Sequence, residues 1–250
     1  MISARFVTVA SVTAVNLTGR VAEPLPSGRM AADLVDIRTF VYEWFARTGA
    51  PPSLMDIGRA HALDEPAVVA ALRSLHDGHL LVLDELRRDI VMAHPWASSP
   101  MGFVVAGPDQ KWWGGCAWDS FAIPALVGRT CLVATHCGGC GAALALDVKP
   151  DRAPIEPWVA HLPVPVLRQW DDVVATCSKQ LLFCRAAHVD EWCARTGTPK
   201  GEVLDLRTLW TLATRWYHGR MSREYRRRTP AEAGVFFAGV GLTGEFWRTE

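Results

Sequence analysis

Two reactive side chains stand close together in the otherwise apolar stretch WWGGCAWDSFAIPALVGR, residues 112–129. Cys116 follows two glycines, and Asp119 comes three positions later. If a helix begins here, both side chains lie on one helix face, one turn apart. A helix N-terminus stabilises a thiolate, and a carboxyl group among apolar neighbours tends to keep its proton. The stretch thus offers a nucleophilic or metal-binding sulfur beside a proton donor. The spacing alone is also compatible with a structural role, in which Cys116 packs in the core and Asp119 caps a turn.

The number of cysteines predicts the redox state of the chain. Seven cysteines occur in 250 residues, an odd count, and none precedes Cys116. A secreted disulfide framework is usually shorter, denser and even in number. We therefore expect mostly reduced thiols and a cytoplasmic protein. Half of the residues are hydrophobic, which is enough for one domain or two small ones.

The first 32 residues are expected to form a flexible leader. Residues 1–19 are only weakly similar to a signal peptide, because Ser, Thr and Asn interrupt their apolar run. Residues 22–30 are rich in Pro, Gly and Ser and are interpreted as a linker. Translation could begin at Met1 or at Met30, and the sequence leaves both open.

Residues 33–95 are predicted to form a winged-helix-like module. Apolar residues at helical spacing, cap residues and turn residues predict a helix ended by Gly49, a short helix capped by Ser53, a helix from Asp64 to Gly78, and two short strands within 79–94. Such modules often bind DNA, but residues 33–94 carry ten acidic and six basic side chains. DNA-binding surfaces need Lys and Arg for phosphates and bases. A structural or partner-docking role is therefore favoured, without nucleic acid and without membrane.

Residues 96–250 are predicted to form an α+β domain with a mixed, mainly antiparallel sheet. Residues 94–102 form the junction. The segments expected beyond it are a hairpin at 103–115, a helix at 117–127 interrupted by Pro124, strands at 130–137 and 143–150, strands at 158–166 and 173–186, a short helix ended by Gly197, and a longer helix at 202–220.

The stretch CAWDSFAIPALVGRTCLVATHC, residues 116–137, resembles the central motif of the organomercurial (alkylmercury) lyases. In that motif, an Asp follows a Cys by three residues, before an apolar run, a GRT sequence and a later HC pair. A second active-site cysteine of the family lies about sixty residues after the first, and Cys177 occupies that place here. The resemblance covers roughly residues 33–200. It is specific at 116–137 and looser around Cys177.

The resemblance implies protonolysis of a carbon–mercury bond. Cys116 and Cys177 would bind the soft metal as thiolates, and Asp119 would deliver the proton and could also contact the metal. No cofactor is implied. An organomercurial would be the substrate, external small thiols would remove Hg(II), and a mercuric reductase or another thiol acceptor would be the partner. The catalytic domain would then be 96–250, with a C-terminal extension.

Several residues depart from the family pattern. The family counterpart of Cys137 is taken as structural, and Cys140 is an addition that creates a CxxC with it. This CxxC could be half of a zinc site, with His136 and Cys131 as the nearest further ligands, a redox pair, or an incidental turn, which is favoured. The residues expected merely to fill the core are Cys184, Cys193 and His188.

Two departures concern the pocket and the tail. Trp118 stands where a smaller aliphatic residue is expected and could reshape the pocket. The arginines 226–228 are interpreted as a solvated helix end, and the apolar residues after them are expected to pack back on the domain.

Two rival functions remain open from the sequence. One is a thiol protein that binds or sequesters a soft metal, mercury or copper, without lyase activity. Cys140 favours it slightly, whereas Asp119 favours the enzyme, because sequestration needs no proton donor. The other rival is a winged-helix regulator, which the acidic module argues against.

Overall fold

The computed structural model describes the backbone of residues 29–86 and 88–250, and side chains from residue 33 onward. The leader expected at 1–32 lies outside the described residues except for its last four, whose backbone begins the first helix. Among the described residues, no helix is both long and apolar enough to cross a membrane.

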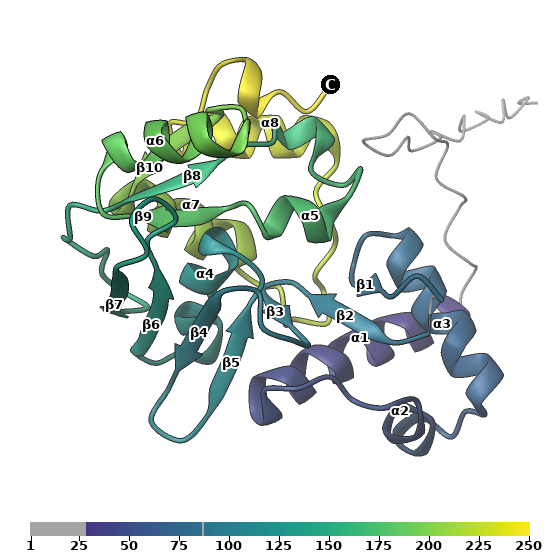
Figure 1. Ribbon diagram of the computed structural model, residues 1–250. Helices are drawn as coiled ribbons and strands as arrows, with labels where there is room; N and C mark the ends of the chain where they lie inside the picture. The colour runs from purple at the N-terminus through teal and green to yellow at the C-terminus, as the bar shows by residue number, and fades with distance from the viewer. Residues whose placement is uncertain (1–28, 87) are drawn as a thin grey trace, which may run out of the picture.

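Three helices form the N-terminal part, shown in purple and blue in Figure 1. They are α1 (Arg29–Thr48), α2 (Leu54–His61) and α3 (Glu65–Asp77). Ser53 and Asp64 cap α2 and α3 as expected, and Ser53 forms a capping box with Asp56. The helical spacing predicted for α1 puts Ile37 in the core. The assignment of residues 33–95 as a separate winged-helix module stays a prediction.

A seven-stranded antiparallel sheet runs through both parts of the chain, in the order β1-β2-β3-β5-β4-β6-β7. Its strands are β1 (Val82–Leu83), β2 (Ile90–Ala93), β3 (Trp96–Ala97), β4 (Phe103–Ala106), β5 (Lys111–Gly114), β6 (Cys131–His136) and β7 (Ala143–Val148). The pairs β1–β2, β4–β5 and β6–β7 confirm the predicted hairpins. The expected junction at 94–102 contains β3, which pairs with both β2 and β5. It is therefore a sheet strand that joins the two parts.

A second, three-stranded antiparallel sheet has the order β10-β8-β9. Its strands are β8 (Val159–Leu162), β9 (Leu181–Phe183) and β10 (Glu202–Asp205). A short turn, η1 (Val166–Arg168), precedes the next helix.

The prediction of a continuous strand at 173–186 was wrong. Residues Val173–Cys177 form helix α5, and β9 follows. The side chain of Asp172 accepts a hydrogen bond from the Ala175 N–H and caps the helix, an effect that outweighs the β-propensity of the two valines.

The predicted long helix at 202–220 likewise begins as a strand. The side chain of Asp205 accepts from the Thr208 N–H, so α7 (Leu206–Tyr217) begins only after it. The residues before Asp205 are extended and pair with β8.

Helix α4 (Ala117–Val127) lies at the centre of the molecule, between the larger sheet and α7 (Figure 1). We expected Pro124 to interrupt it, but the helix continues to Gly128, where φ is 67°. Phe121 and Ile123 are fully buried. Their packing offsets the hydrogen bond that proline cannot make.

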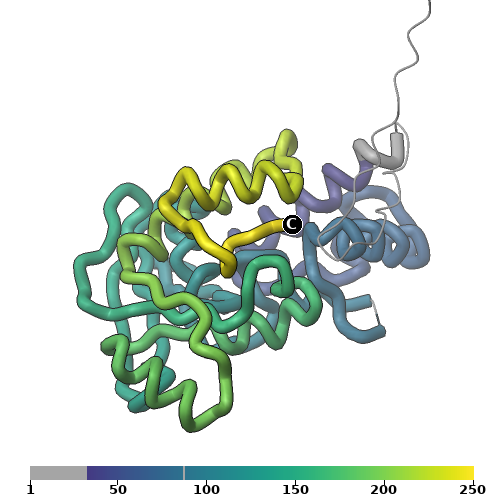
Figure 2. The backbone as a smooth tube through the Cα atoms, turned by 90° about the horizontal axis from the view of Figure 1, so that it is seen from above, coloured from purple at the N-terminus to yellow at the C-terminus, as the bar shows by residue number. Residues whose placement is uncertain are grey.

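The C-terminal segment packs back on the domain, as expected. Helices α6 (Ala186–Thr196) and α8 (Pro230–Gly239) and the turn η2 (Glu245–Trp247) complete the described elements. Figure 2 shows this yellow segment lying across the green and teal body. Phe237 and Trp247 are buried and contact the Trp118 ring.

The interpretation of arginines 226–228 as a solvated helix end was wrong. They precede α8 rather than end a helix. The guanidinium of Arg227 lies over Trp170, and that of Arg228 over Trp216. Stacking on aromatic rings therefore holds two of these three side chains.

Candidate active site around Cys116, Asp119 and Cys177

Cys116 caps the N-terminus of α4, directly after strand β5. Its Sγ accepts a hydrogen bond from the Asp119 N–H at 3.4 Å. The two preceding glycines are required by close packing. A Cβ on Gly115 would lie 2.4 Å from Asp119 Oδ2, and one on Gly114 would lie 2.1 Å from Ser120 Oγ. The sequence GGC therefore lets the start of α4 press against the sheet and brings the Asp119 carboxyl group back over β5.

Cys177 reaches the same place from the end of α5. Its Sγ lies 3.8 Å from Asp119 Oδ2 and contacts the thiol of Cys116. All three side chains are buried, with 2–5% of their surface exposed. The backbone helps to hold this arrangement, because the Ala117 N–H donates to the Gln180 carbonyl, three residues after Cys177. The three residues singled out in the sequence are thus neighbours in the structure.

His94 is a fourth member of this group, and sequence reasoning missed it. Its Nε2 lies 3.7 Å from Cys177 Sγ, and its ligand atom lies within 4.8 Å of those of Asp119 and Cys177. The strand β3 after it places it there, and Pro95 accepts a hydrogen bond from the Gly115 N–H. Coulombic attraction to Asp119 and the contact with Cys177 raise the His94 pKa, although burial opposes this. Only knowledge of the pairing of residues 96–97 with β5 could have located it.

Tyr217, at the end of α7, donates its hydroxyl hydrogen bond to Asp119 Oδ1. Burial and the neighbouring carboxylate raise its pKa well above the usual value, so it stays a donor. Behind it, the buried guanidinium of Arg220 donates to the hydroxyls of Tyr42 and Tyr225. Asp119 is therefore held from the side opposite Cys177.

The two thiols differ in their tendency to ionise. Hydrogen bonding from Cys116 and the contact with His94 lower the Cys177 pKa, against the effect of burial. Burial, the neighbouring Cys177 and the Asp119 charge raise the Cys116 pKa well above its usual value. The expectation of a lowered pKa for Cys116 was therefore wrong, because desolvation outweighs the helix terminus. Of the two thiols, Cys177 therefore ionises more readily than Cys116.

A cavity of ≈ 90 Å³ opens onto these groups. Apolar and aromatic side chains from α4, α5, α7 and α8 wall it, Trp118 and Phe237 among them. Four buried polar atoms on its lining have no hydrogen-bond partner, namely His79 Nδ1, His94 Nδ1, Trp118 Nε1 and Gln180 Oε1. Buried polar atoms without partners are uncommon in proteins. The cavity thus combines apolar walls suited to a hydrocarbon group with polar and charged groups, the arginines 220, 227 and 228 among them.

The remaining cysteines lie elsewhere. Cys131 is buried at the start of β6, and Cys193 lies on α6. The structure instead gathers Cys137, Cys140, Cys184 and His188, with ligand atoms all within 4.8 Å of one another. Cys184 and His188, which were expected to fill the core, are thus also members of this group, whereas His136 and Cys131 are not. These residues come from segments more than forty positions apart, which the sequence does not bring together.

Part of the chain is similar in sequence to known proteins. Residues 97–218 match the family model described as "MerB: Alkylmercury lyase". An alkylmercury lyase of Staphylococcus epidermidis is 31% identical over 112 residues, which are 44% of this chain and 51% of that protein. One from Bacillus cereus is 26% identical over 152 residues, 60% of this chain and 65% of that protein. The chain therefore matches about half to two thirds of the length of these relatives.

A solved structure agrees in fold. The mercury-bound form of MerB2 superposes with a TM-score of 0.60, at 14% identity, over 76% of this chain and 92% of that chain. At this identity, the likeness concerns the α+β fold alone. The family model, the curated relatives and the fold agree: residues 97–218, just under half of this chain, match the alkylmercury lyase family.

Proposed function

We propose that this protein is an organomercurial lyase that cleaves a carbon–mercury bond by protonolysis, giving a hydrocarbon and Hg(II). The observation that carries the proposal is the meeting of Cys116, Asp119 and Cys177 at one buried cavity. Two thiols suit the soft metal, and the carboxyl group beside them can move a proton.

The first step is capture of the substrate by Cys177. This thiol has the lowered pKa, so it binds the mercury atom of R–Hg⁺ as a thiolate. The apolar walls of the cavity receive the organic group and exclude water. His94, whose pKa is raised, stabilises the negative charge of Cys177 before the substrate arrives.

The second step moves the proton of Cys116. Asp119 accepts this proton as Cys116 binds mercury, and then delivers it to the carbon atom. The carbon–mercury bond breaks, its electron pair takes the proton, and R–H leaves. In balance, R–Hg⁺, one thiolate and one thiol give R–H and a neutral dithiolate of Hg(II). No redox change occurs and no cofactor is used.

The Asp119 carboxyl group must keep its orientation during this transfer. Tyr217 holds Oδ1, which leaves Oδ2 facing the thiols. The backbone N–H of Asp119 also fixes Cys116 Sγ. Tyr217 is therefore a positioning residue in this proposal, because it acts through Asp119.

Product release requires other thiols, because two buried sulfur ligands hold mercury tightly. External small thiols would exchange with Cys116 and Cys177, and a mercuric reductase or another thiol acceptor would take the ion. The proposal includes a reducing compartment, the cytoplasm, since both thiols must be reduced for the reaction.

The test uses purified protein with excess small thiol and phenylmercury, and follows benzene release. We expect multiple turnovers by the wild-type protein and none by Cys116→Ala or Cys177→Ala. Cys193→Ala is the matched control, because this cysteine lies outside the cavity. Benzene release by either active-site variant at the wild-type rate would contradict the roles of the thiols.

The rival function gives a different outcome in the same assay. A protein that only sequesters a soft ion would bind mercury in stoichiometric amount and release no benzene. That result would overturn the lyase proposal and leave Asp119 a structural residue.

A further inference from the structure

A second group of sulfur ligands lies outside the active site. We name Cys137, Cys140, Cys184 and His188 the Cys3His cluster. The first two belong to the turn between β6 and β7, Cys184 directly follows β9, and His188 lies in the first turn of α6. The ligands thus follow the pattern C-x2-C, then 43 residues, then C-x3-H. Paired ligands at such short spacings are typical of structural zinc sites.

The distances within the cluster match those of a tetrahedral site. Cys137 Sγ lies 3.3 Å from His188 Nδ1, and Cys140 Sγ lies 3.8 Å from Cys184 Sγ. Zinc–sulfur bonds of about 2.3 Å and a zinc–nitrogen bond of about 2.0–2.1 Å place tetrahedral ligands about 3.5–3.8 Å apart. These two separations are close to those values, and all four ligand atoms lie within 4.8 Å of one another.

The glycines of the turn permit this approach. A Cβ on Gly139 would lie 2.5 Å from His188 Cβ, and one on Gly138 would lie 2.7 Å from the Phe183 ring. Gly141, with φ at 73°, turns the chain so that its N–H bonds the Cys137 carbonyl. The sequence CGGCG thus folds a tight turn against the segment that carries the other two ligands.

The sulfur atom of Cys137 is surrounded by hydrogen-bond donors. The Cys184 N–H points at it at 3.4 Å, and the N–H groups of Cys140 and Gly139 also face it. Although desolvation opposes ionisation, these donors and His188 lower the Cys137 pKa to about 6. Metal binding requires thiolates, and these N–H groups are placed to stabilise one at Cys137.

The Cys184 thiol lacks such compensation. Burial and the neighbouring thiols Cys137 and Cys140 raise the Cys184 pKa to about 11. Three thiolates this close repel one another unless a cation lies between them. A divalent ion would therefore displace the remaining thiol protons.

A disulfide explains the cluster less completely. Cys140 and Cys184 Sγ atoms are 3.8 Å apart, whereas a disulfide bond is about 2.05 Å long. A disulfide between Cys140 and Cys184 would not explain the contact between Cys137 and His188. The imidazole is the feature that separates a metal site from a redox pair.

We propose that the Cys3His cluster is a structural zinc site that clamps the turn 137–141 to the segment 184–188. Three thiolates and one imidazole form a closed tetrahedral set, with no open position for a substrate. Zinc is the preferred ion for such a set, and binding transfers no electrons. On binding, the thiols release their protons to solvent.

The clamp also bears on the active site. The Gly138 N–H donates to the Leu182 carbonyl, and the Ala117 N–H donates to the Gln180 carbonyl. Residues 177–184 are thus held by α4 at one end and by the turn of the Cys3His cluster at the other. Zinc would fix the position from which the chain presents Cys177.

The test measures zinc in the full-length protein, purified from zinc-supplemented cells, by elemental analysis. We expect one zinc per chain in the wild-type protein and in Cys116→Ala/Cys177→Ala, and none in Cys140→Ser or His188→Ala. Cys193→Ser is the matched control, because Cys193 lies on the same helix as His188 but outside the cluster, and it should keep its zinc.

A second measurement covers the case in which the cluster variants fail to fold. Wild-type protein stripped of metal and loaded with Co²⁺ should show the visible bands of a tetrahedral thiolate site, and zinc should abolish them. Wild-type protein that binds neither ion, or that shows a Cys140–Cys184 disulfide in place of metal, would overturn the proposal. Zinc lost with Cys116 and Cys177 would overturn it as well, by placing the ion in the active site. None of these outcomes depends on benzene release, so the zinc and lyase proposals fail separately.

Discussion

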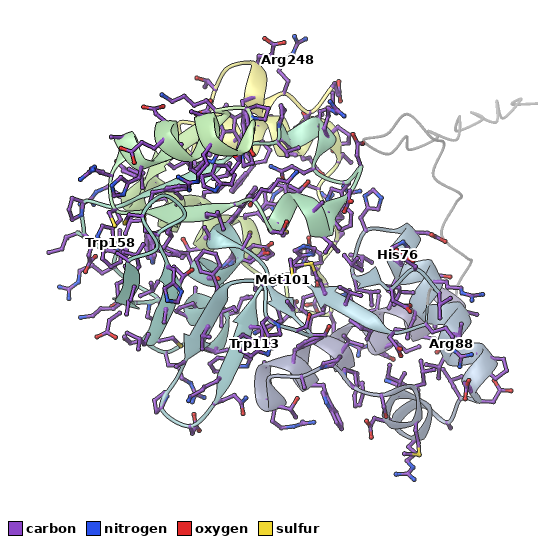
Figure 3. The ribbon with its side chains drawn as sticks, in the orientation of Figure 1. His76, Arg88, Met101, Trp113, Trp158 and Arg248 are labelled. Carbon is purple, nitrogen blue, oxygen red and sulfur yellow. The ribbon has the colours of Figure 1, made fainter. Side chains whose placement is uncertain are left out.

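The two sulfur groups of this chain share an element but differ in their surroundings. Cys116 and Cys177 lie in a buried cavity beside the carboxyl group of Asp119. In the Cys3His cluster, Cys140 is exposed, and the fourth member is an imidazole. Figure 3 shows how densely side chains fill the space around the central elements, with Met101 labelled near the middle of the molecule.

The difference lies in what each site can do with a proton. In the candidate active site, the Cys177 pKa is lowered and the Cys116 pKa is raised, and a carboxyl group lines the same cavity as both thiols. The Cys3His cluster contains no carboxyl group, and its four ligand atoms lie within 4.8 Å of one another. The presence of cysteines alone therefore does not distinguish a catalytic site from a structural metal site. The carboxyl group of Asp119 and the cavity beside the cysteines make this distinction.

The largest expected effect comes from Asp119→Asn. This change removes the proton carrier but preserves the shape of the side chain, and general acid catalysis is typically worth about 10²–10⁴-fold. We expect kcat for benzene release to fall by that factor, while mercury still binds to both thiols and the zinc content does not change. Steady-state kinetics and mercury titration measure the two quantities, and an unchanged kcat would refute the proton role.

Gly139→Ala is expected to weaken zinc binding by the Cys3His cluster. The added Cβ would lie 2.5 Å from His188 Cβ and 2.9 Å from the His188 carbonyl oxygen, so it pushes one ligand away. We expect zinc affinity to fall by about tenfold to a hundredfold, as found when the support of a ligand is lost. Competition with a chromogenic chelator measures this affinity. Gly239→Ala is the control, since a Cβ there meets no atom within 4 Å.

Tyr217→Phe removes one hydrogen bond from Asp119. A hydrogen bond to a charged group is worth about 1.5–3 kcal/mol, which corresponds to about tenfold to a hundredfold in rate. We expect kcat to fall within this range with little change in KM, because the phenol does not bind mercury. Tyr225→Phe, which loses a contact to Arg220 but none to Asp119, serves as the comparison.

His94→Gln is expected to move the pH profile. His94 helps to lower the Cys177 pKa, so its removal raises that pKa. The thiolate then forms only at higher pH, and the acidic limb of kcat/KM shifts upward. The loss of rate should therefore be large at low pH and small at high pH, and a profile that stays in place would exclude this role.

The smallest effect is expected for Trp118→Leu. Trp118 lines the cavity and packs against Trp216, Phe237 and Trp247. A smaller side chain enlarges the cavity, so activity on phenylmercury should rise relative to methylmercury by a few fold. Competition between the two substrates measures the ratio, and an unchanged ratio would show that Trp118 does not shape selectivity.

Local sequence signals predicted much of the fold. Cap residues such as Ser53 and Asp64 and the alternation in β6 and β7 placed elements correctly, because their causes lie within a few residues. Strand β3, helix α5 and strand β10 were missed. The strands β3 and β10 are short and are stabilised by strands from other parts of the sequence. Helix α5 depends on the cap at Asp172.

The candidate site divides in the same way. Cys116 and Asp119 share one helix turn, so their pairing could be read from spacing, and Cys177 came from the resemblance. Spacing could not predict the positions of His94, Tyr217 and the second half of the Cys3His cluster. Pairing between strands and the packing of α7 place these residues beside the cysteines. Tertiary contacts between distant segments leave no local pattern.

One measurement tests the central claim most directly. Wild-type protein and Asp119→Asn would each receive one equivalent of phenylmercury without added thiol, and intact-protein mass spectrometry would weigh the product. We predict that the wild-type protein retains bare mercury on two thiols, with its phenyl group lost as benzene, and that Asp119→Asn retains intact phenylmercury. Wild-type protein that still carries the phenyl group would contradict the account.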